Sequence, residues 1–374
     1  MSTEHAPDRT LLVTVDSLRY DRFEHMPRTR DFLDRTHDRA FATSTATLGS
    51  FPAIIGGEYA AGGGLEREQS VAHEFDAYSA GITTNHLLSA EYGYDAGFDS
   101  FVSPKGGGES LKDRGAVMLQ RGTLPHRIAT WGWNRYQQLQ SLVGEIEKSF
   151  RPADDVVSSF RREVDDRESW FGWLHFMEPH HPYDPDDAPV GREEAQRVTR
   201  TVLAGRGSEA DEELVRELYE REIAELDAAL DELWEAIPDD TRVVFCADHG
   251  ELLGEGGLWG HPGEMRPELL HVPFGTKNAP DLGDVVSLID VPTVLRGAEH
   301  GLGTLDREVA FAAYGDRKAA MNAEHIATAE GTRRLTDGES TTDSSLEGDL
   351  ERFDPEYVVK EEALREDLED LGYV

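Results

Sequence analysis

Residues 242–263, RVVFCADHGELLGEGGLWGHPG, decide the fold that we expect for this chain. Residues 243–247 are continuously apolar and rich in β-branched and aromatic side chains, the pattern of a strand buried on both faces of a parallel sheet. The run ends at Asp248 and His249, and His261 follows after a glycine-rich loop. Open α/β sheets bind ligands at the carboxyl ends of their strands, and carboxylates and imidazoles both bind metals. The segment therefore predicts a metal site at a sheet edge, although a solvated turn fits the same residues.

The composition is extremely acidic. The chain of 374 residues has 74 Asp and Glu against 37 Lys and Arg, which gives a formal net charge of -37. The acids alternate with apolar positions along the whole length, so they do not form a disordered tail. Such a surface repels itself in dilute buffer but is tolerable in concentrated salt, because the Debye length falls to about 3 Å at 1 M. We expect a halophile's cytosolic protein; an acidic protein that binds cationic partners is the alternative.

Other classes of protein are disfavoured by what the sequence lacks. It has no basic stripe, so we expect no nucleic-acid ligand. The single cysteine, Cys246, excludes an internal disulfide and a cysteine-based zinc cage. No stretch approaches the roughly 18 apolar residues of a membrane span, and the N-terminal residues lack a secretory signal pattern. We therefore expect a cytoplasmic, soluble protein, and the sequence carries no signal for an oligomeric state.

A second apolar run, residues 11–15, also ends at a carboxylate, Asp16. Because the carboxyl ends of parallel strands meet at one edge, we expect Asp16 and Asp248 to share a site. Leucines and isoleucines at helical spacing over residues 212–237 predict an amphipathic helix that leads into the strand at 243–247. Helices alternate with strands throughout, so we predict an α/β fold with a doubly wound, mostly parallel sheet flanked by helices. The remaining predictions are strands at 80–85, 170–177 and 271–274, helices at 27–36, 155–165 and 285–295, and irregular segments at 86–114 and 184–208.

The pattern changes near residue 306, where short predicted strands at 309–314, 325–329 and 333–335 are joined by turns and followed by a charged helix at 357–371. We interpret this tail as a small C-terminal antiparallel α+β subdomain packed on the main domain. The predicted division is therefore a main domain at 1–305 and a subdomain at 306–374.

Two further polar segments carry candidate site residues. Residues 42–64 place hydroxyl side chains ahead of Pro52 and glycines after it, and a helix that is entered at proline offers free N–H groups to an anion. A Ser/Thr loop that only caps a helix fits this segment equally well. After the strand at 170–177, prolines bracket His180 and His181 and fix the loop, so we expect these histidines at the site.

Together these segments resemble the sulfatase branch of the alkaline phosphatase superfamily, especially the short sulfatase-like proteins of haloarchaea. LLVTVDSLRYDRF resembles the opening strand with the first metal carboxylate, and TLGSFPAIIGG resembles the nucleophile segment. FGWLHFMEPHHPY is similar to the loop with a histidine before proline and tyrosine, and VVFCADHGELLGEGGLWGHPG to the second metal motif. MRPELLHVPFG, DVPT and the closing LEDLGYV also match, so the resemblance covers nearly the whole chain in order.

Two registers are open for the nucleophile. In sulfatases it is a cysteine or serine converted to formylglycine, followed at fixed spacing by proline and arginine. Counting back from Gly57 places Thr47 there; threonine cannot become formylglycine, but it is the nucleophile of the related phosphoglycerol and phosphoethanolamine transferases. Anchoring on Pro52 instead selects Ser50, with Ile54 where the arginine is required. We favour Thr47 and keep Ser50 as the alternative.

The resemblance implies one divalent metal ion, Ca, Mg or Mn, which makes a hydroxyl acidic and neutralises charge on the transferring group. It also implies histidines that contact substrate oxygens, one of which protonates the leaving alcohol. Ser17 stands where many relatives have a second metal-binding aspartate, which favours a single, less tightly held ion. The implied residues are Asp16, Asp248, His249 and Thr47 for the metal, Thr47, His261 and His180 for catalysis, and Ser50, His181 and His175 for substrate binding.

We therefore expect a metal-dependent hydrolase that acts on sulfate or phosphate esters of small molecules or glycans, with a sulfatase-like catalytic domain at 1–305. One alternative is a transferase that moves a phospho-alcohol group onto a glycan. The other is a catalytically degenerate sulfatase fold that binds its ligand without turnover, because the nucleophile segment lacks the expected arginine.

Overall fold

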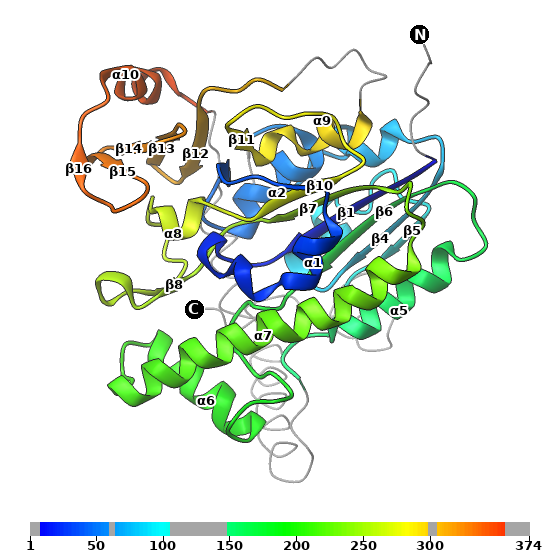
Figure 1. The fold of residues 1–374 in the computed structure, drawn as a ribbon, viewed down its shortest axis with the longest axis horizontal. Helices are drawn as coiled ribbons and strands as arrows, with labels where there is room; N and C mark the ends of the chain where they lie inside the picture. The colour runs from blue at the N-terminus through cyan, green and yellow to red at the C-terminus, as the bar shows by residue number, and fades with distance from the viewer. Residues whose placement is uncertain (1–7, 60–63, 105–147, 298–304, 356–374) are drawn as a thin grey trace, which may run out of the picture.

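The computed structural model describes residues 8–59, 64–104, 148–297 and 305–355. Its centre is a seven-stranded sheet (Figure 1). In spatial order the strands are β2 (Arg35–Thr36), β10 (Phe274–Lys277), β7 (Arg242–Ala247), β1 (Arg9–Val15), β6 (Trp170–Phe176), β4 (Tyr78–Thr83) and β5 (Ser100–Val102). The strands from β7 to β5 are parallel, and β10 runs antiparallel to both of its neighbours. The predicted α/β fold with a mostly parallel sheet is confirmed.

The register of the central strands aligns the two predicted acids. Val15 lies opposite Phe176 on β6 and opposite Ala247 on β7. One residue further, the Asp16 N–H donates to the Phe176 carbonyl at 2.9 Å, and the Asp248 N–H donates to the Val15 carbonyl at 3.2 Å. The hydrogen-bond ladder therefore holds both acids at the same edge of the sheet, as the sequence predicted.

Helices cover both faces of this sheet (Figure 1). On one face lie α1 (Pro27–Phe32), α5 (Ala153–Val164) and α7 (Glu209–Ala236), and on the other lie α2 (Thr47–Gly56) and α9 (Val291–Arg296). The long helix α7 begins at a capping box made by Ser208 and Asp211 and buries its apolar stripe, which confirms the prediction at 212–237. Among the helices that the structure describes, none combines the length and apolarity needed to cross a bilayer.

The prediction of an irregular segment at 184–208 is wrong for the second half of that segment. Residues Arg192–Leu203 form helix α6, which packs beside α7. Its apolar contacts come from only a few positions, Ala195, Val198 and Val202, spaced three and four residues apart among charged side chains. The helical period is present, but the surrounding acids and arginines hid it.

Two other predicted elements are shifted by proline. The strand predicted at 271–274 begins only at Phe274, after the short helix α8 (Pro267–Leu270), since Pro273 has no N–H for the ladder. The helix predicted at 285–295 begins only at Val291, because Pro292 occupies the first turn, where a missing N–H costs nothing. Before it, Val286–Ser287 form strand β11. The helix predicted at 27–36 ends at Phe32, and the next residues pair with β10 as β2.

The tail forms a separate antiparallel sheet, as predicted. Its strands are β12 (Ala310–Tyr314), β13 (Arg317–Met321), β14 (His325–Thr328), β15 (Gly331–Arg334) and β16 (Ser340–Thr341), followed by helix α10 (Ser344–Arg352). Strand β12 joins it to the main domain, where the Ala313 N–H donates to the Thr43 carbonyl at 3.0 Å. The helix predicted at 357–371 lies outside the described residues, and the boundary at 305/306 stays a prediction.

Candidate active site

Asp16, Asp248 and His249 meet at the carboxyl edge of the sheet, and we call them the acid cluster. One ligand atom from each lies within 4.8 Å of the others, and all three side chains are fully buried. His249 Nε2 is 3.5 Å from Asp248 Oδ2 and 3.8 Å from Asp16 Oδ1. Nδ1 of His249 donates to the Gly250 carbonyl at 2.8 Å, so Nε2 carries the lone pair that a metal requires.

The electrostatics of the acid cluster fit a cation. Burial disfavours the charged form of Asp16, but His180, His175 and His249 outweigh that effect and hold its pKa well below the ordinary value. Burial and the Asp16 charge raise the pKa of Asp248 well above its ordinary value. Among the described residues, Asp248 Oδ2 has no hydrogen-bond partner. A divalent ion would satisfy this oxygen and ionise both carboxylates, so the donor set fits the implied metal.

The favoured nucleophile, Thr47, faces this cluster from the first turn of α2. Its Oγ1 donates to Asp16 Oδ2 at 3.3 Å and lies 3.5 Å from His249 Nε2. The predicted helix entry at Pro52 is wrong, because α2 begins at Thr47 and Pro52 lies inside it. The earlier start places the hydroxyl, rather than the proline, at the helix end that meets the acids.

Ser50, the alternative nucleophile, is one turn further along α2. Its hydroxyl is buried and donates to the Ser44 carbonyl at 3.3 Å. No described contact joins Ser50 to the acid cluster, and its role in substrate binding stays a prediction. The two registers that the sequence left open are therefore distinguished by which hydroxyl faces Asp16.

His175, for which substrate binding stays a prediction, lies next to Asp16. It lies on β6, is fully buried, and contacts Thr14 Oγ1 through Nδ1 at 3.0 Å. Its Nε2 is 3.5 Å from Asp16 Oδ2. This position behind Asp16 suits a side chain that orients the carboxylate, not one that contacts a substrate.

Two neighbours of the acids make hydrogen bonds that the sequence analysis did not predict. Asn85 Nδ2 donates to Asp16 Oδ2 at 3.0 Å. The N–H of Ser17 donates to Asp248 Oδ1 at 3.2 Å, and its hydroxyl donates to Asp16 Oδ1 at 2.9 Å. Ser17 makes both hydrogen bonds with a left-handed backbone, φ 59°. Residues in this rare conformation are often found at functional sites. A signal for Asn85 was present, because it follows a buried strand that ends at the same sheet edge.

The other predicted histidines gather beside the acids, and we call His180, His181 and His261 the histidine cluster. A ring nitrogen of each lies within 4.8 Å of the others. The His180 and His181 rings stack with centroids 4.3 Å apart, and the His261 ring is 4.7 Å from that of His249. The structure thus brings the loop after β6 and the glycine-rich loop after β7 to one site, as the resemblance implied.

Glu251 connects these histidines and was also missed, although it stands inside the quoted motif. Its side chain is fully buried, with Oε1 3.4 Å from His261 Nδ1 and Oε2 3.7 Å from His181 Nδ1. Burial opposes ionisation of Glu251, but His261 and His181 hold its pKa far below the ordinary value. Burial lowers the pKa of His261, but Glu251 reverses this and raises it overall. Burial lowers the pKa of His180 to about 3.

The loop that carries His180 and His181 rests on helix α7. The Asp184 N–H donates to Glu222 Oε1 at 2.6 Å, and Glu222 is almost completely buried. Burial and the charge of Glu178 raise the pKa of Glu222 well above its ordinary value. The support of the histidine loop is therefore a buried acid whose environment favours the protonated form.

Gly250 directly follows Asp248 and His249 of the acid cluster, and its lack of a side chain is required by packing. A Cβ at this position would collide with the Glu268 carbonyl oxygen. The Gly250 N–H donates to the Leu269 carbonyl at 2.9 Å. The motif therefore requires glycine because α8 packs directly on its backbone.

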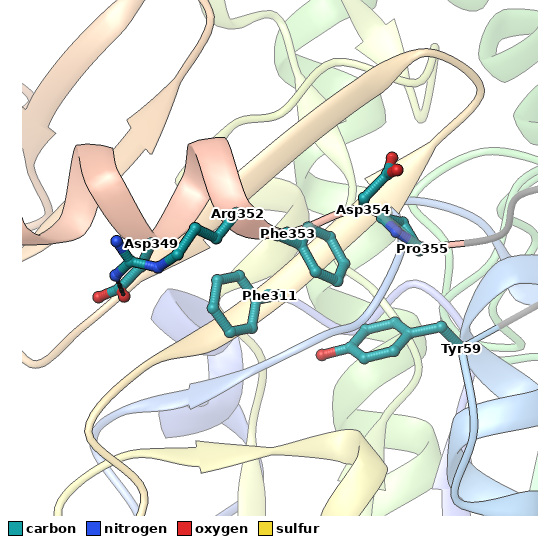
Figure 2. A pocket seen from close by; sticks show the side chains of 7 residues that line it. All are labelled: Tyr59, Phe311, Asp349, Arg352, Phe353, Asp354 and Pro355. Carbon is teal, nitrogen blue, oxygen red and sulfur yellow. Dashed lines mark hydrogen bonds and ion pairs between the residues drawn. The ribbon is translucent and has the colours of Figure 1, made fainter.

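A cavity of about 400 Å³ lies elsewhere, between the end of α2 and the C-terminal sheet (Figure 2). Phe353 contacts Phe311 and Tyr59, with ring centroids 4.6 and 5.1 Å apart. No residue of the acid or histidine cluster lines it, so we assign this cavity to the packing of the subdomain. The lining residues are Tyr59, Phe311, Asp349, Arg352, Phe353, Asp354 and Pro355.

Comparison with known proteins gives a family match. The Sulfatase family profile matches residues 10–274. The chain is 42% identical over 78 residues to the low-salt glycan biosynthesis sulfotransferase of Haloferax volcanii. The matched segment covers 18% of this chain and 19% of that protein. The chain is 27% identical over 169 residues to the choline-sulfatase of Rhizobium meliloti, which covers 36% and 33% respectively. The chain thus spans no more than about a third of the length of these curated relatives.

Solved structures show the same fold. The phosphonate monoester hydrolase of Agrobacterium radiobacter superposes with a TM-score of 0.56 at 15% identity, covering 87% of both chains. A crystal structure of Ps i-CgsB with neocarrahexaose gives a TM-score of 0.60 at 16% identity, covering 93% of this chain and 92% of that one. At these identities the likeness establishes the architecture alone.

Proposed function

The chain belongs to the sulfatase family, and from that premise we propose that it is a metal-dependent enzyme that cleaves sulfate or phosphate esters with Thr47 as nucleophile. One observation carries the proposal. The Thr47 hydroxyl lies 3.3 Å from Asp16 and 3.5 Å from His249, in a buried group of metal-ligand side chains. Ser50, which bonds to a backbone carbonyl, offers no such geometry.

Asp16, Asp248, His249 and the Thr47 oxygen would hold one divalent ion, for which Ca, Mg and Mn are the candidates. When bound, the ion lowers the pKa of the hydroxyl and offsets negative charge on the transferring group. Asn85 and Ser17 orient the carboxylates, since Asn85 donates a hydrogen bond to Asp16 and Ser17 donates one to each acid.

The reaction uses this chain's side chains in two steps. Thr47 loses its hydroxyl proton to solvent, and Oγ1 then forms a bond to sulfur or phosphorus while the bond to the alcohol oxygen breaks. His261, whose pKa Glu251 raises, stands beside the acid cluster and gives a proton to the leaving alcohol, while His180 next to it contacts the substrate. Water then cleaves the threonine ester, and the released sulfate or phosphate leaves Thr47 with its proton restored.

A transferase is the second candidate, favoured by one observation. The relative with 42% identity over 78 residues is named a glycan biosynthesis sulfotransferase. In such a reaction an acceptor hydroxyl, instead of water, attacks the threonine ester. Small-molecule and glycan esters are therefore both candidate substrates.

The test is turnover of nitrophenyl sulfate and nitrophenyl phosphate in concentrated salt with added Ca, Mg or Mn. We expect Thr47→Ala to lower kcat/KM by at least about 10³-fold, whereas Thr47→Ser retains part of the activity. Ser50→Ala is the matched control from the same helix and should change the rate by less than about 10-fold.

Three outcomes separate the alternatives. Unchanged turnover in Thr47→Ala with loss in Ser50→Ala would show that the register is wrong. Product formation only after a sugar or alcohol acceptor is added would identify the transferase. Binding of the ester without turnover under either condition would identify a degenerate fold and refute both enzymes.

A further inference from the structure

A row of fully buried polar side chains leads through the core of the sheet to the carboxylate of Asp16. Thr14 on β1 lies opposite His175 on β6, and Trp173 precedes His175 by two residues, so the three side chains share one face of the sheet. We propose that Thr14 and Trp173 are positioning residues that act through His175. They fix the tautomer whose proton lies on Nε2 and faces Asp16. The inference rests on the proposed function, in which Asp16 holds the ion.

Three contacts connect this row. The Trp173 Nε1–H donates to Thr14 Oγ1 at 3.1 Å. Thr14 Oγ1 in turn lies 3.0 Å from His175 Nδ1 and 3.1 Å from the Leu174 carbonyl oxygen, so its single proton can serve either acceptor. His175 Nε2 is 3.5 Å from Asp16 Oδ2 and has no hydrogen-bond partner within the described residues. Two arrangements of the protons therefore fit the same heavy atoms.

The carboxylate of Asp16 decides between these two arrangements. It accepts hydrogen bonds on both oxygens, and the donors are Asn85, Thr47 and Ser17. Such a carboxylate has no proton to give, and a bare lone pair on His175 Nε2 would be repelled by it. Nε2 therefore carries the proton, and the Thr14 hydroxyl donates to the lone pair on Nδ1. A small movement of the ring would close the hydrogen bond to Asp16, which satisfies a buried N–H that is costly to leave unpaired.

The His175 ring also contacts the helix that carries the nucleophile. Phe51 lies one turn after Thr47 in α2, and its ring meets that of His175 edge to face, with centroids 4.9 Å apart and planes at 86°. The Phe51 ring also contacts Trp173, at 5.7 Å between centroids. His175 is therefore packed between the first metal carboxylate and the helix of Thr47, so its orientation matters to both.

The row acts on the geometry of a metal ligand and not on the substrate. Hydrogen bonds in a buried row polarise one another, so the Trp173 N–H strengthens donation by Thr14, and Thr14 strengthens donation by His175. Groups that hydrogen-bond a metal ligand fix its orientation, and their loss lowers metal affinity or activity by about 10- to 100-fold. Loss of the Thr14 hydroxyl should therefore weaken metal binding, although Thr14 does not itself contact the acid cluster.

The first experiment determines the tautomer of His175 by NMR. The full chain is labelled with ¹⁵N in its histidine rings and studied in concentrated salt with Mg²⁺. The nitrogen chemical shifts distinguish a protonated ring nitrogen from a bare one, and the signals that disappear in His175→Gln are those of His175. We expect a bare Nδ1 and a protonated Nε2 in the wild type. A protonated Nδ1, whether Nε2 is bare or protonated, would overturn the proposal.

The second experiment tests the row with matched variants. Thr14→Val replaces the hydroxyl with a methyl group, so we expect loss of the fixed tautomer and Mn²⁺ binding weakened by about 10-fold. Binding is measured from the electron paramagnetic resonance signal of the free ion. Thr14→Ser keeps a hydroxyl and should behave nearly as the wild type does, and Trp173→Phe should have a smaller effect than Thr14→Val. Thr10→Val, the same change four residues earlier on β1, should alter neither measurement.

Each result supports or refutes the inference. Wild-type tautomer and Mn²⁺ affinity in Thr14→Val would overturn it, and so would equal losses in Thr14→Ser and Thr14→Val, which indicate a structural role. If Thr14→Val does not fold, the wild-type tautomer and the Trp173→Phe variant still decide. Neither measurement needs turnover. The expected tautomer and losses without ester cleavage would refute only the proposed function, whereas ester cleavage with the opposite tautomer would refute only this inference.

Discussion

The acid cluster and the histidine cluster lie side by side, but the fold holds them in different ways. Asp16 and Asp248 directly follow β1 and β7, and their backbone N–H groups continue the sheet ladder. His180 and His181 stand on a loop, and His261 follows a glycine-rich turn. The acid cluster is fully buried, whereas His181 and His261 are partly exposed.

The difference indicates a division of labour. Strand ends in the middle of a parallel sheet are among the most rigid positions that a fold offers, so they suit groups that must converge on one ion. Loops tolerate change and meet the substrate, so they suit groups that recognise it. We expect substitutions in the acid cluster to act on catalysis as a whole, and substitutions around the histidine loop to act in a graded way.

The largest expected effect tests the rigid side of this comparison. Asp248→Asn keeps the shape of the side chain but removes a charged metal ligand, so we expect kcat/KM to fall by at least about 10³-fold. The metal-free variant should be no less stable than the wild type, because the substitution removes repulsion against Asp16. Turnover and thermal unfolding of the same preparation measure both effects. Equal loss of activity and stability would indicate that Asp248 is a structural residue.

A smaller effect is expected one layer further out. Asn85→Ala removes the hydrogen bond to Asp16 Oδ2 and leaves the metal ligands in place. Loss of such a supporting contact lowers metal affinity or activity by about 10- to 100-fold. A titration with Mn²⁺ that monitors activity measures the affinity. Full activity at saturating metal would place the effect on binding, and an unchanged titration would show that Asn85 contributes nothing.

The smallest expected effect lies under the histidine loop. Because the pKa of Glu222 is raised, the folded state holds a proton that the unfolded chain has lost, and the wild type loses stability as pH rises above the ordinary glutamate pKa. Glu222→Gln keeps an acceptor for the Asp184 N–H and has no proton to lose. The free energy of unfolding of the variant should therefore rise relative to that of the wild type between about pH 5 and about pH 8, by at most about 2 kcal/mol. Urea unfolding at the two pH values measures this, and a constant difference would contradict it.

The sequence was most informative where one physical rule acts alone. Continuous apolar runs that stop at an acid identified β1 and β7, because a buried parallel strand must be apolar on both faces. The same rule predicts from the sequence alone that Asp16 lies near Asp248. The sequence did not predict helix α6, because only three of its positions are apolar and buried among many charged residues. Those three positions form a buried contact only because α7 packs against them.

The chemistry of the site depended more heavily on tertiary structure. The sequence left Thr47 and Ser50 open, since both hydroxyls precede the same proline and lie in the same helix. Only the path of α2 past the sheet edge turns one hydroxyl toward Asp16 and the other toward a carbonyl. The contacts of Asn85, Ser17 and Glu251 were not predicted because they join residues far away in the chain or across a turn.

The amino-acid pattern by itself determined the class of fold, the sheet edge at which the acids meet, and the acidity of the surface. These three properties follow from the hydrophobicity and charge of the side chains, which are known from the sequence. The folded arrangement alone decided which hydroxyl faces the acids, and that a buried glutamate joins two of the three histidines. Those facts depend on distances of a few ångströms between segments up to about 200 residues apart, and only packing sets such distances.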